Sequence, residues 1–205
     1  MNLIHQDYVE IQNGKGRQLL NDDVVHDWYR FVLAYPDHLV AEMLEQFGTT
    51  QGDVVLDPFS GTGTTLVEAK KLGIASIGIE ANPACVFASR VKTNWSLNAK
   101  SLRSSAALVT QRARPRIEML TFDAEPLFQW AIDPREIEIA KKALVANSPE
   151  GQYFISSKML KRRWMSEKPF YKTLVVLEEI KSLEVASDIR NALLLAMVAI
   201  LVESV

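Results

Sequence analysis

The stretch from Val54 to Pro83 constrains the fold of this chain more than any other part of its sequence. It reads VVLDPFSGTGTTLVEAKKLGIASIGIEANP, in which an apolar run leads into an acid and a glycine-containing loop. Helix-forming residues follow, and a second apolar run ends on another acid. This order predicts a βαβ unit, with strands over residues 54–56 and 75–79 and a helix over about 64–72.

The polar residues of this unit gather where its strands end. Asp57 stands at the carboxyl end of the first strand, and Glu80 at the end of the second. Gly61 and Gly63 lack the Cβ atoms that would keep the backbone away from a ligand. A carboxylate roughly 20 residues beyond such a loop can accept hydrogen bonds from both hydroxyls of a ribose. The pattern therefore predicts a site for a nucleoside-containing cofactor.

The loop sequence discriminates between cofactor classes. A dinucleotide-binding loop carries a third glycine inside the helix, where this chain has Leu66. A triphosphate-binding loop would need G-x-x-x-x-G-K-[ST], which does not occur in this chain. An acid directly ahead of the glycines repels phosphate and attracts an amine. S-adenosylmethionine carries an ammonium, a sulfonium and a ribose, so it fits this loop better than a pyrophosphate cofactor.

The string DPFSGTGTT followed by GIE resembles the cofactor motif of DNA amino-methyltransferases, which methylate N6 of adenine or N4 of cytosine. By this resemblance, the loop lines the methionine end of S-adenosylmethionine, Glu80 holds the ribose hydroxyls, and the next two residues border the adenine. The implied residues are Asp57, Phe59, Ser60, Gly61, Thr62, Gly63 and Thr64 for the methionine end, and Ala81 and Asn82 for the adenine.

The segment before the loop resembles a second cofactor motif of the same family. It runs from Trp28 through Tyr35 and Pro36, and a predicted helix continues it to Phe47. The resemblance implies that Tyr29 contacts the cofactor. For Tyr29, and equally for Phe31 and Tyr35, a place in an ordinary aromatic core is the alternative interpretation.

The family's catalytic tetrapeptide, [DNS]-P-P-[YF], is absent from this chain. In the family its polar groups take hydrogen bonds from the amine to be methylated, and its aromatic ring stacks on the flipped base. The nearest strings, NSPE at 147–150 and EKPF at 167–170, each lack the second proline, and both are predicted to be loops. We therefore assign no catalytic residue and no metal site.

Composition agrees with part of an enzyme. The 205 residues are 48% hydrophobic and 23% charged, enough for a real core, and the net charge of −2 gives no overall basic footprint. The lone Cys85 excludes an intrachain disulfide and favours a buried position in a cytoplasmic protein. The amino terminus shows no signal peptide.

The remaining sequence predicts mostly helix. Helices are expected over 84–94, 101–114 and 135–147, the last capped by Asp133, with a proline-punctuated linker and a short strand over 117–122 before it. The apolar run at 192–202 lies in a terminal helix that is too short to span a bilayer. In the βαβ unit, Thr64 or Thr65 is expected to cap the amino terminus of the helix that follows the glycine loop.

Two basic clusters are candidates for nucleic-acid contact. The first covers residues 112–116, and the second runs from 158 to 164 and ends on an aromatic ring. Cationic side chains beside a stacking ring are typical of nucleic-acid binding, and a solvated helix face is the alternative. The residues assigned to DNA contact are Lys161, Arg162, Arg163 and Trp164.

The fold class expected is α/β: a Rossmann-like methyltransferase sheet, incomplete and with its front strands only, followed by a helical carboxyl-terminal appendage. Residues 1–98 form the S-adenosylmethionine-binding βαβ region, and residues 99–205 a helical region for target recognition or partner docking. The chain would stop where the strand that carries the tetrapeptide should begin, as in a truncated or split enzyme.

These expectations define one function and two alternatives. The chain is a DNA methyltransferase of the restriction-modification type, or the cofactor-binding half of one. The alternatives are a non-catalytic cofactor-binding or interaction subunit and a fragment of an RNA base methyltransferase. The expected partners are DNA and either a second copy of this chain or another polypeptide that supplies the missing half. No membrane is expected as a partner.

Overall fold

The computed structural model describes residues 25–29, 34–120, 133–158 and 165–203. The chain divides into two compact units, Met1–Ser96 and Leu97–Val205.

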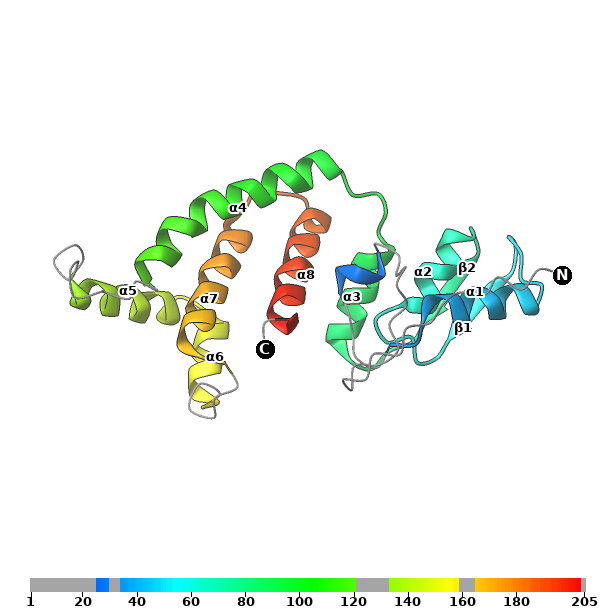
Figure 1. Cartoon of the computed structure of the whole chain (residues 1–205), viewed down its shortest axis with the longest axis horizontal. Coiled ribbons are helices and arrows are strands. Elements are labelled where there is room, and N and C mark those ends of the chain that lie inside the picture. Colours follow the sequence, from blue (N-terminus) through cyan, green and yellow to red (C-terminus); the bar gives the residue numbers. More distant parts are fainter. Residues whose placement is uncertain (1–24, 30–33, 121–132, 159–164, 204–205) are drawn as a thin grey trace, which may run out of the picture. The chain divides into compact units, whose positions relative to one another are not determined.

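The amino-terminal unit contains a small parallel sheet and the helices around it (Figure 1). Strands β1 (Val54–Asp57) and β2 (Ala75–Gly78) pair in parallel, with Val54 opposite Ala75 and Asp57 opposite Gly78. Helix α2 (Thr64–Lys71) connects them, so the predicted βαβ unit is confirmed. The other elements are a 3₁₀ turn η1 (His26–Trp28), α1 (Asp37–Gln46) and α3 (Pro83–Thr93).

Gly63, and not a threonine, is the cap of α2. Its φ of 88° lies in the left-handed region, and no side chain caps the helix. Thr64 is already the first helical residue and is buried, so the predicted threonine cap is wrong. A Cβ on Gly63 would lie 2.7 Å from Cβ of Ser89 in α3, which fixes glycine at this position. The close approach of two helices therefore decides the cap.

The two faces of the sheet differ in cover. A Cβ on Gly78 would lie 2.8 Å from Cδ1 of Leu66, so this face is packed against α2, whose Val67 and Ala69 are buried. The residues of the opposite face are apolar and more than half exposed. They are Val54, Leu56, Ile77 and Ile79. Within the described part of the amino-terminal unit, nothing covers this apolar face.

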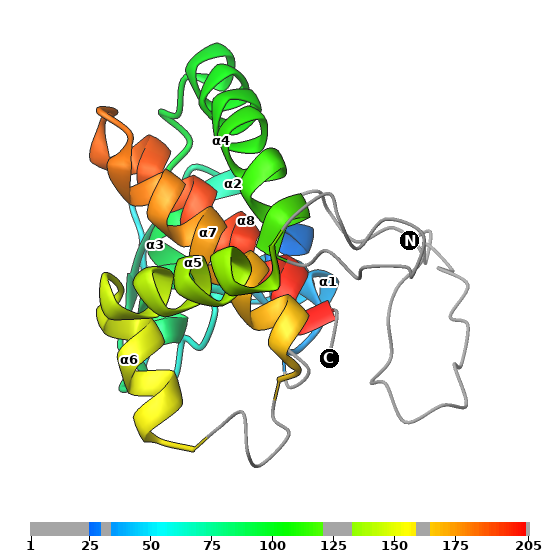
Figure 2. The same cartoon turned by 90° about the vertical axis from the view of Figure 1, so that its left-hand side faces the viewer.

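The carboxyl-terminal unit is entirely helical in its described part. Its helices are α4 (Ala99–Leu120), α5 (Pro134–Ala146), α6 (Pro149–Ser156), α7 (Glu167–Ser182) and α8 (Ser187–Glu203) (Figure 2). One buried cluster joins α4, α5 and α7 around Phe170, and a second joins α4, α7 and α8 around Ile180. Arg116 also ties α4 to α7 by donating to Glu178 and Glu179 at 2.5 Å each.

Three predictions for this unit are wrong. α4 continues through Pro115 to Leu120, so residues 117–120 are helix and not strand. Buried Ala113 and Leu120 lie on either side of the proline and contact the same cluster, so packing keeps the helix continuous. The string at 167–170 forms the first turn of α7 and is not a loop.

The string at 147–150 is not a loop either, because its last two residues begin α6. Ser148 caps α6 by accepting a hydrogen bond from the Gly151 N–H, and Pro149 is the first helical residue. The Asp133 cap of α5 is confirmed, because its side chain accepts from the Arg135 N–H. Among the described residues, no helix is long and apolar enough to cross a membrane.

Candidate functional site

The candidate site lies where the two strands end. Beyond the paired residues, the Ile79 N–H donates to the Asp57 carbonyl at 2.9 Å, and the Ser60 N–H donates to the Ile79 carbonyl at 3.1 Å. These bonds hold the start of the glycine loop against the end of β2. Asp57 and Glu80 are thereby placed at one edge of the sheet, as parallel strands require.

The Asp57 carboxylate is held by two donors. Its Oδ1 accepts from the Phe59 N–H at 3.0 Å, and its Oδ2 accepts from the Tyr35 hydroxyl at 2.9 Å. Asp57 itself is half-buried. The carboxylate therefore has a defined orientation at the entrance of the loop, with lone pairs left on both oxygens for an ammonium group.

The Glu80 carboxylate is held in a similar way, by backbone. Its Oε2 accepts from the Gly61 N–H at 2.9 Å, and its Oε1 accepts from the Asn82 N–H at 2.7 Å. Glu80 thus ties the glycine loop to the start of α3, where the Asn82 side chain accepts from the Ala84 N–H. Each oxygen keeps a lone pair for a further donor, such as a ribose hydroxyl.

The loop side chains fall into two groups. Ser60, Thr62 and Thr64 are buried, so they shape the loop from inside. Phe59 is 84% exposed, and Ala81 and Asn82 are exposed as well. A ligand at this edge meets the exposed residues, the two carboxylates and the open backbone at Gly61, where a Cβ would have no neighbour within 4 Å.

The structure separates the aromatic candidates. Tyr29 is half-buried at the end of η1, and no hydrogen bond in the described part of the chain joins it to the loop. Tyr35 is bonded to both Asp57 and Thr65. The sequence predicts the cofactor contact at Tyr29 and not at Tyr35, because the hydrogen-bond partners of Tyr35 lie 22 and 30 residues away in the chain. Phe31 and the DNA-contact candidates Lys161 to Trp164 lie outside the described residues.

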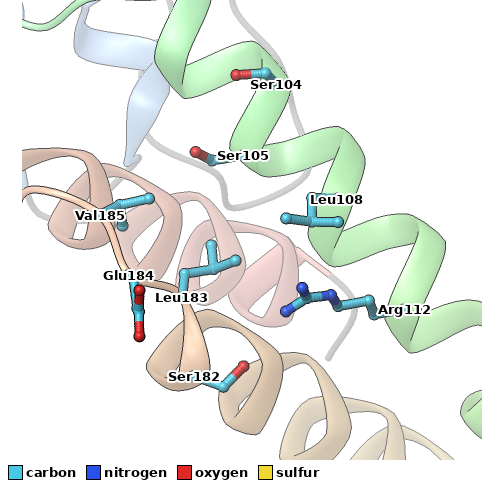
Figure 3. A pocket seen from close by; sticks show the side chains of 8 residues that line it. All are labelled: Ser104, Ser105, Leu108, Arg112, Ser182, Leu183, Glu184 and Val185. Atoms are coloured by element: carbon cyan, nitrogen blue, oxygen red, sulfur yellow. The ribbon is translucent and has the colours of Figure 1, made fainter.

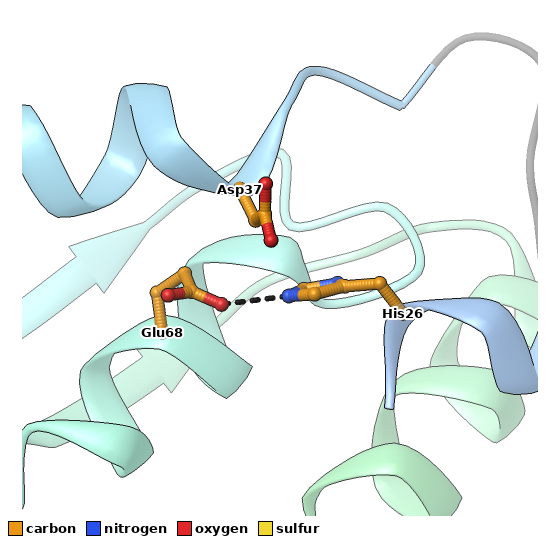
Figure 4. Close-up of side chains that lie close together, drawn as sticks. All are labelled: His26, Asp37 and Glu68. Carbon is orange, nitrogen blue, oxygen red and sulfur yellow. Dashed lines mark hydrogen bonds and ion pairs between the residues drawn. The ribbon is translucent and has the colours of Figure 1, made fainter. Parts of the chain in front are cut away.

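A second polar cluster joins η1, α1 and α2. His26 Nε2 lies 2.7 Å from Glu68 Oε1, and the Lys71 ammonium donates to the same oxygen at 2.6 Å (Figure 4). Burial raises the pKa of Glu68, but the bonds to His26 and Lys71 outweigh it, and the net shift is downward. Asp37 completes a group of possible metal ligands within 4.8 Å of one another. Because Lys71 already neutralises Glu68, we interpret this group as an ion pair that fastens η1 and α2.

The carboxyl-terminal unit has a hollow of about 460 Å³ between α4 and the turn from α7 to α8 (Figure 3). Ser104 and Ser182 at its wall donate to the carbonyls of Ser101 and Glu179, so their protons are engaged. Arg112 and Glu184 bring opposite charges to it. We assign no ligand to this hollow.

The family comparison agrees with the site. Residues 9–89 match the model of the N6_N4_Mtase family, described as DNA methylase. Over this part of the chain, the amino-terminal segment is therefore similar to DNA amino-methyltransferases of the N6-adenine/N4-cytosine type. Enzymes of this family use S-adenosylmethionine as the methyl donor.

Three curated relatives support the match. Type II methyltransferase M.BsoBI of Geobacillus stearothermophilus is 48% identical over 59 residues, which are 29% of this chain and 12% of the relative. M.MjaII of Methanocaldococcus jannaschii is 38% identical over 61 residues, 28% of this chain and 12% of the relative. M2.DpnII of Streptococcus pneumoniae is 50% identical over 46 residues, 22% and 17% respectively. The matched stretch thus spans less than a fifth of each relative, and no solved structure matches significantly.

Proposed function

We propose that the amino-terminal unit binds S-adenosylmethionine and forms the cofactor-binding part of a DNA amino-methyltransferase of the restriction-modification type. One observation carries this proposal. Two oriented carboxylates, Asp57 and Glu80, flank a glycine loop at adjacent strand ends, inside the segment that matches the DNA methylase family. The two-stranded sheet is then the front of a larger Rossmann-like methyltransferase sheet.

In this proposal the residues of the loop divide the cofactor among them. Asp57 attracts the ammonium of the methionine part, and Glu80 accepts from the ribose hydroxyls. Phe59 and the loop backbone from Ser60 to Thr64 line the methionine end, and Ala81 and Asn82 border the adenine. Tyr29 stays a proposed contact as well. The lone pairs left free on Asp57 and Glu80 support this arrangement.

The cofactor supplies the methyl group, and this chain positions it. The target amine of a DNA base attacks the methyl carbon in line, so positioning and shielding are the main contributions of the protein. The residues that orient the amine belong to the tetrapeptide that this sequence lacks. We therefore propose that activity requires a second polypeptide, or a further segment, that supplies the base-binding half of the site.

The carboxyl-terminal unit takes the role of target recognition or partner docking in this proposal. Lys161, Arg162, Arg163 and Trp164 are its proposed DNA contacts, and the cytoplasm is its proposed compartment. A non-catalytic subunit that binds the cofactor and regulates a partner is the second candidate. The absence of the tetrapeptide favours it.

Calorimetric titration of the full chain tests the cofactor proposal. S-adenosylhomocysteine should bind, and Glu80→Ala should weaken binding by roughly ten- to a hundredfold, because a hydrogen bond to a charged group contributes about 1.5–3 kcal/mol. Glu80 also accepts hydrogen bonds from two backbone N–H groups, so Glu80→Ala removes these bonds as well. Two ligands that differ only in their ribose hydroxyls separate this effect from the loss of the ribose contact. Wild type should prefer adenosine to 2′,3′-dideoxyadenosine, and the variant should lose this preference. A variant that keeps the preference would remove the ribose assignment.

Labelled methyl transfer tests the catalytic proposal. The full chain alone should transfer no methyl group to DNA that lacks amino-methylation, because nothing in it orients the base amine. Transfer by this chain alone, abolished by Asp57→Ala, would show that the catalytic residues lie within these 205 residues.

A further inference from the structure

Tyr35 joins three parts of the amino-terminal unit through one hydroxyl group. It lies just ahead of α1, and its hydroxyl is 2.9 Å from Oδ2 of Asp57 at the end of β1. The same hydroxyl is 2.6 Å from Oγ1 of Thr65, in the first turn of α2. Both polar partners therefore belong to the cofactor loop or border it.

The chemistry of the partners fixes the direction of the two hydrogen bonds. An ionised carboxylate only accepts, so Tyr35 gives its single proton to Asp57. The Tyr35 oxygen then accepts from the Thr65 hydroxyl. Burial raises the pKa of Tyr35, and the Asp57 charge adds to this effect against the opposing bond from Thr65, so the phenol keeps its proton at neutral pH. The result is a chain from Thr65 through Tyr35 to Asp57.

The surroundings of the ring favour a role at the site over a role in the core. Tyr35 is 38% exposed, so its side chain is not enclosed in a core. A tyrosine kept for packing would bury its ring, whereas here the hydroxyl makes the specific contacts. Since the Phe59 N–H holds the other oxygen of Asp57, the Tyr35 bond completes the fixed orientation of this carboxylate.

We propose that Tyr35 is a positioning residue for the amino-acid end of the cofactor. It orients the Asp57 carboxylate so that the remaining lone pairs face the ammonium group, and it does not touch the ligand itself. This inference rests on the proposed function of the loop and adds to it a residue that acts through Asp57. Its effect should appear only with ligands that carry the ammonium group.

The test compares two ligands on the full-length chain. S-adenosylhomocysteine carries the amino-acid end, and 5′-methylthioadenosine lacks it. Tyr35→Phe should weaken binding of S-adenosylhomocysteine by about three- to tenfold, the loss expected for one hydrogen bond, and should leave 5′-methylthioadenosine unchanged. Asp57→Asn should show the same selectivity, and the double variant should lose less than the product of the two single losses.

Two substitutions of Thr65 and one control substitution separate positioning from folding. Thr65→Val removes the donor to Tyr35 and should cause a smaller selective loss, whereas Thr65→Ser should restore wild-type binding. Tyr153→Phe, at an exposed tyrosine of the other unit, is the matched control and should change nothing. Thermal melting of each variant shows that it is folded.

The possible results distinguish the positioning role of Tyr35 from the proposed cofactor-binding function. Equal affinity of wild type and Tyr35→Phe for S-adenosylhomocysteine would overturn the inference and leave the proposed function standing. A parallel loss of both ligands would overturn it too, because it would show a general structural role. Failure of the wild type to bind either ligand would remove the proposed function, and the role of Tyr35 with it.

Discussion

At the scale of single residues, the candidate site depends on acids whose orientation is fixed before any ligand arrives. Asp57 and Glu80 each accept two hydrogen bonds within the described chain, three of the four from backbone N–H groups and one from the Tyr35 hydroxyl. An oriented carboxylate loses little freedom on binding, so more of its interaction energy appears as affinity. The glycines serve the same end, since they let the loop turn tightly beside α3.

Gly63→Ala should destabilise the amino-terminal unit by about 1–3 kcal/mol in urea denaturation. The alanine Cβ would meet Ser89 at 2.7 Å, in a left-handed backbone conformation that L-residues rarely adopt. Gly61→Ala is the matched control, because it has a positive φ of 50° but no neighbour within 4 Å. It should cost less, and equal losses for both variants would show that backbone strain, and not the contact with α3, decides the effect.

Lys92 should make stability depend on pH in the alkaline range. Burial lowers the pKa of this lysine from 10.5 to about 8, although the charge of Asp27 opposes the shift. Between these two values the unfolded chain binds a proton that the folded chain does not, so stability rises with pH from about 8 to 10.5. Below this range the buried ammonium is at its most unfavourable.

Lys92→Met should therefore stabilise the protein at pH 7, by up to roughly 3 kcal/mol, and by much less at pH 10. Denaturant unfolding of both proteins at the two pH values gives the difference directly. A difference that is the same at pH 7 and pH 10 would contradict the assignment, since a packing effect alone would not titrate.

At the scale of elements, tertiary packing keeps α4 helical although Pro115, inside it, disfavours a helix. Pro115 lacks the N–H that would bond the Gln111 carbonyl, and its ring crowds that carbonyl. The buried contacts of Ala113 and Leu120 on either side outweigh this cost. Arg116 adds its bonds to Glu178 and Glu179 on α7.

Pro115→Ala should stabilise the carboxyl-terminal unit by about 1–2 kcal/mol. Restoring the helical hydrogen bond gains up to about 3 kcal/mol, and the greater freedom of the unfolded chain takes back part of it. Residue 115 is exposed, so the change removes no core contact. Thermal unfolding followed by circular dichroism is the measurement, with exposed Glu118→Ala as a neutral control. A lower melting temperature for Pro115→Ala would mean that the ring itself stabilises the unit.

At the scale of the whole molecule, the exposed apolar face of the sheet is the main destabilising feature of the described residues. Two strands alone do not make a stable sheet, and β1 and β2 pair only with each other in the described part. One face still exposes Val54, Leu56, Ile77 and Ile79. At about 25 cal/mol per Å², covering ~300 Å² of such surface would contribute roughly 7 kcal/mol, comparable to the stability of a domain.

The full chain should therefore associate at micromolar concentration, with itself or with a polypeptide that supplies further strands. Sedimentation velocity should show a species larger than 23.0 kDa, or the monomer should shift on adding the partner. Leu56→Thr with Ile77→Thr puts β-branched polar residues, which suit strands, at both positions and should weaken this association. The matched control is Ile139→Thr, an exposed isoleucine of the other unit. A cooperative monomer that binds no partner would contradict this expectation.

Local sequence patterns were enough to predict the strands and the helix of the βαβ unit, because the residues that define each element lie close together in the chain. The apolar runs, the glycine loop and the two acids defined β1, α2, β2 and the edge at which a ligand site forms. The Asp133 cap could be predicted for the same reason, since the Arg135 N–H that it accepts from is only two residues away.

Features that depend on residues far apart in the chain became visible only in the folded structure. Ser89 makes Gly63 the cap of α2, and core contacts carry α4 through Pro115. The Tyr35 hydroxyl finds Asp57 across 22 residues of sequence. Local patterns cannot contain such contacts, because the free energy that fixes them comes from side chains that meet only when the chain has folded.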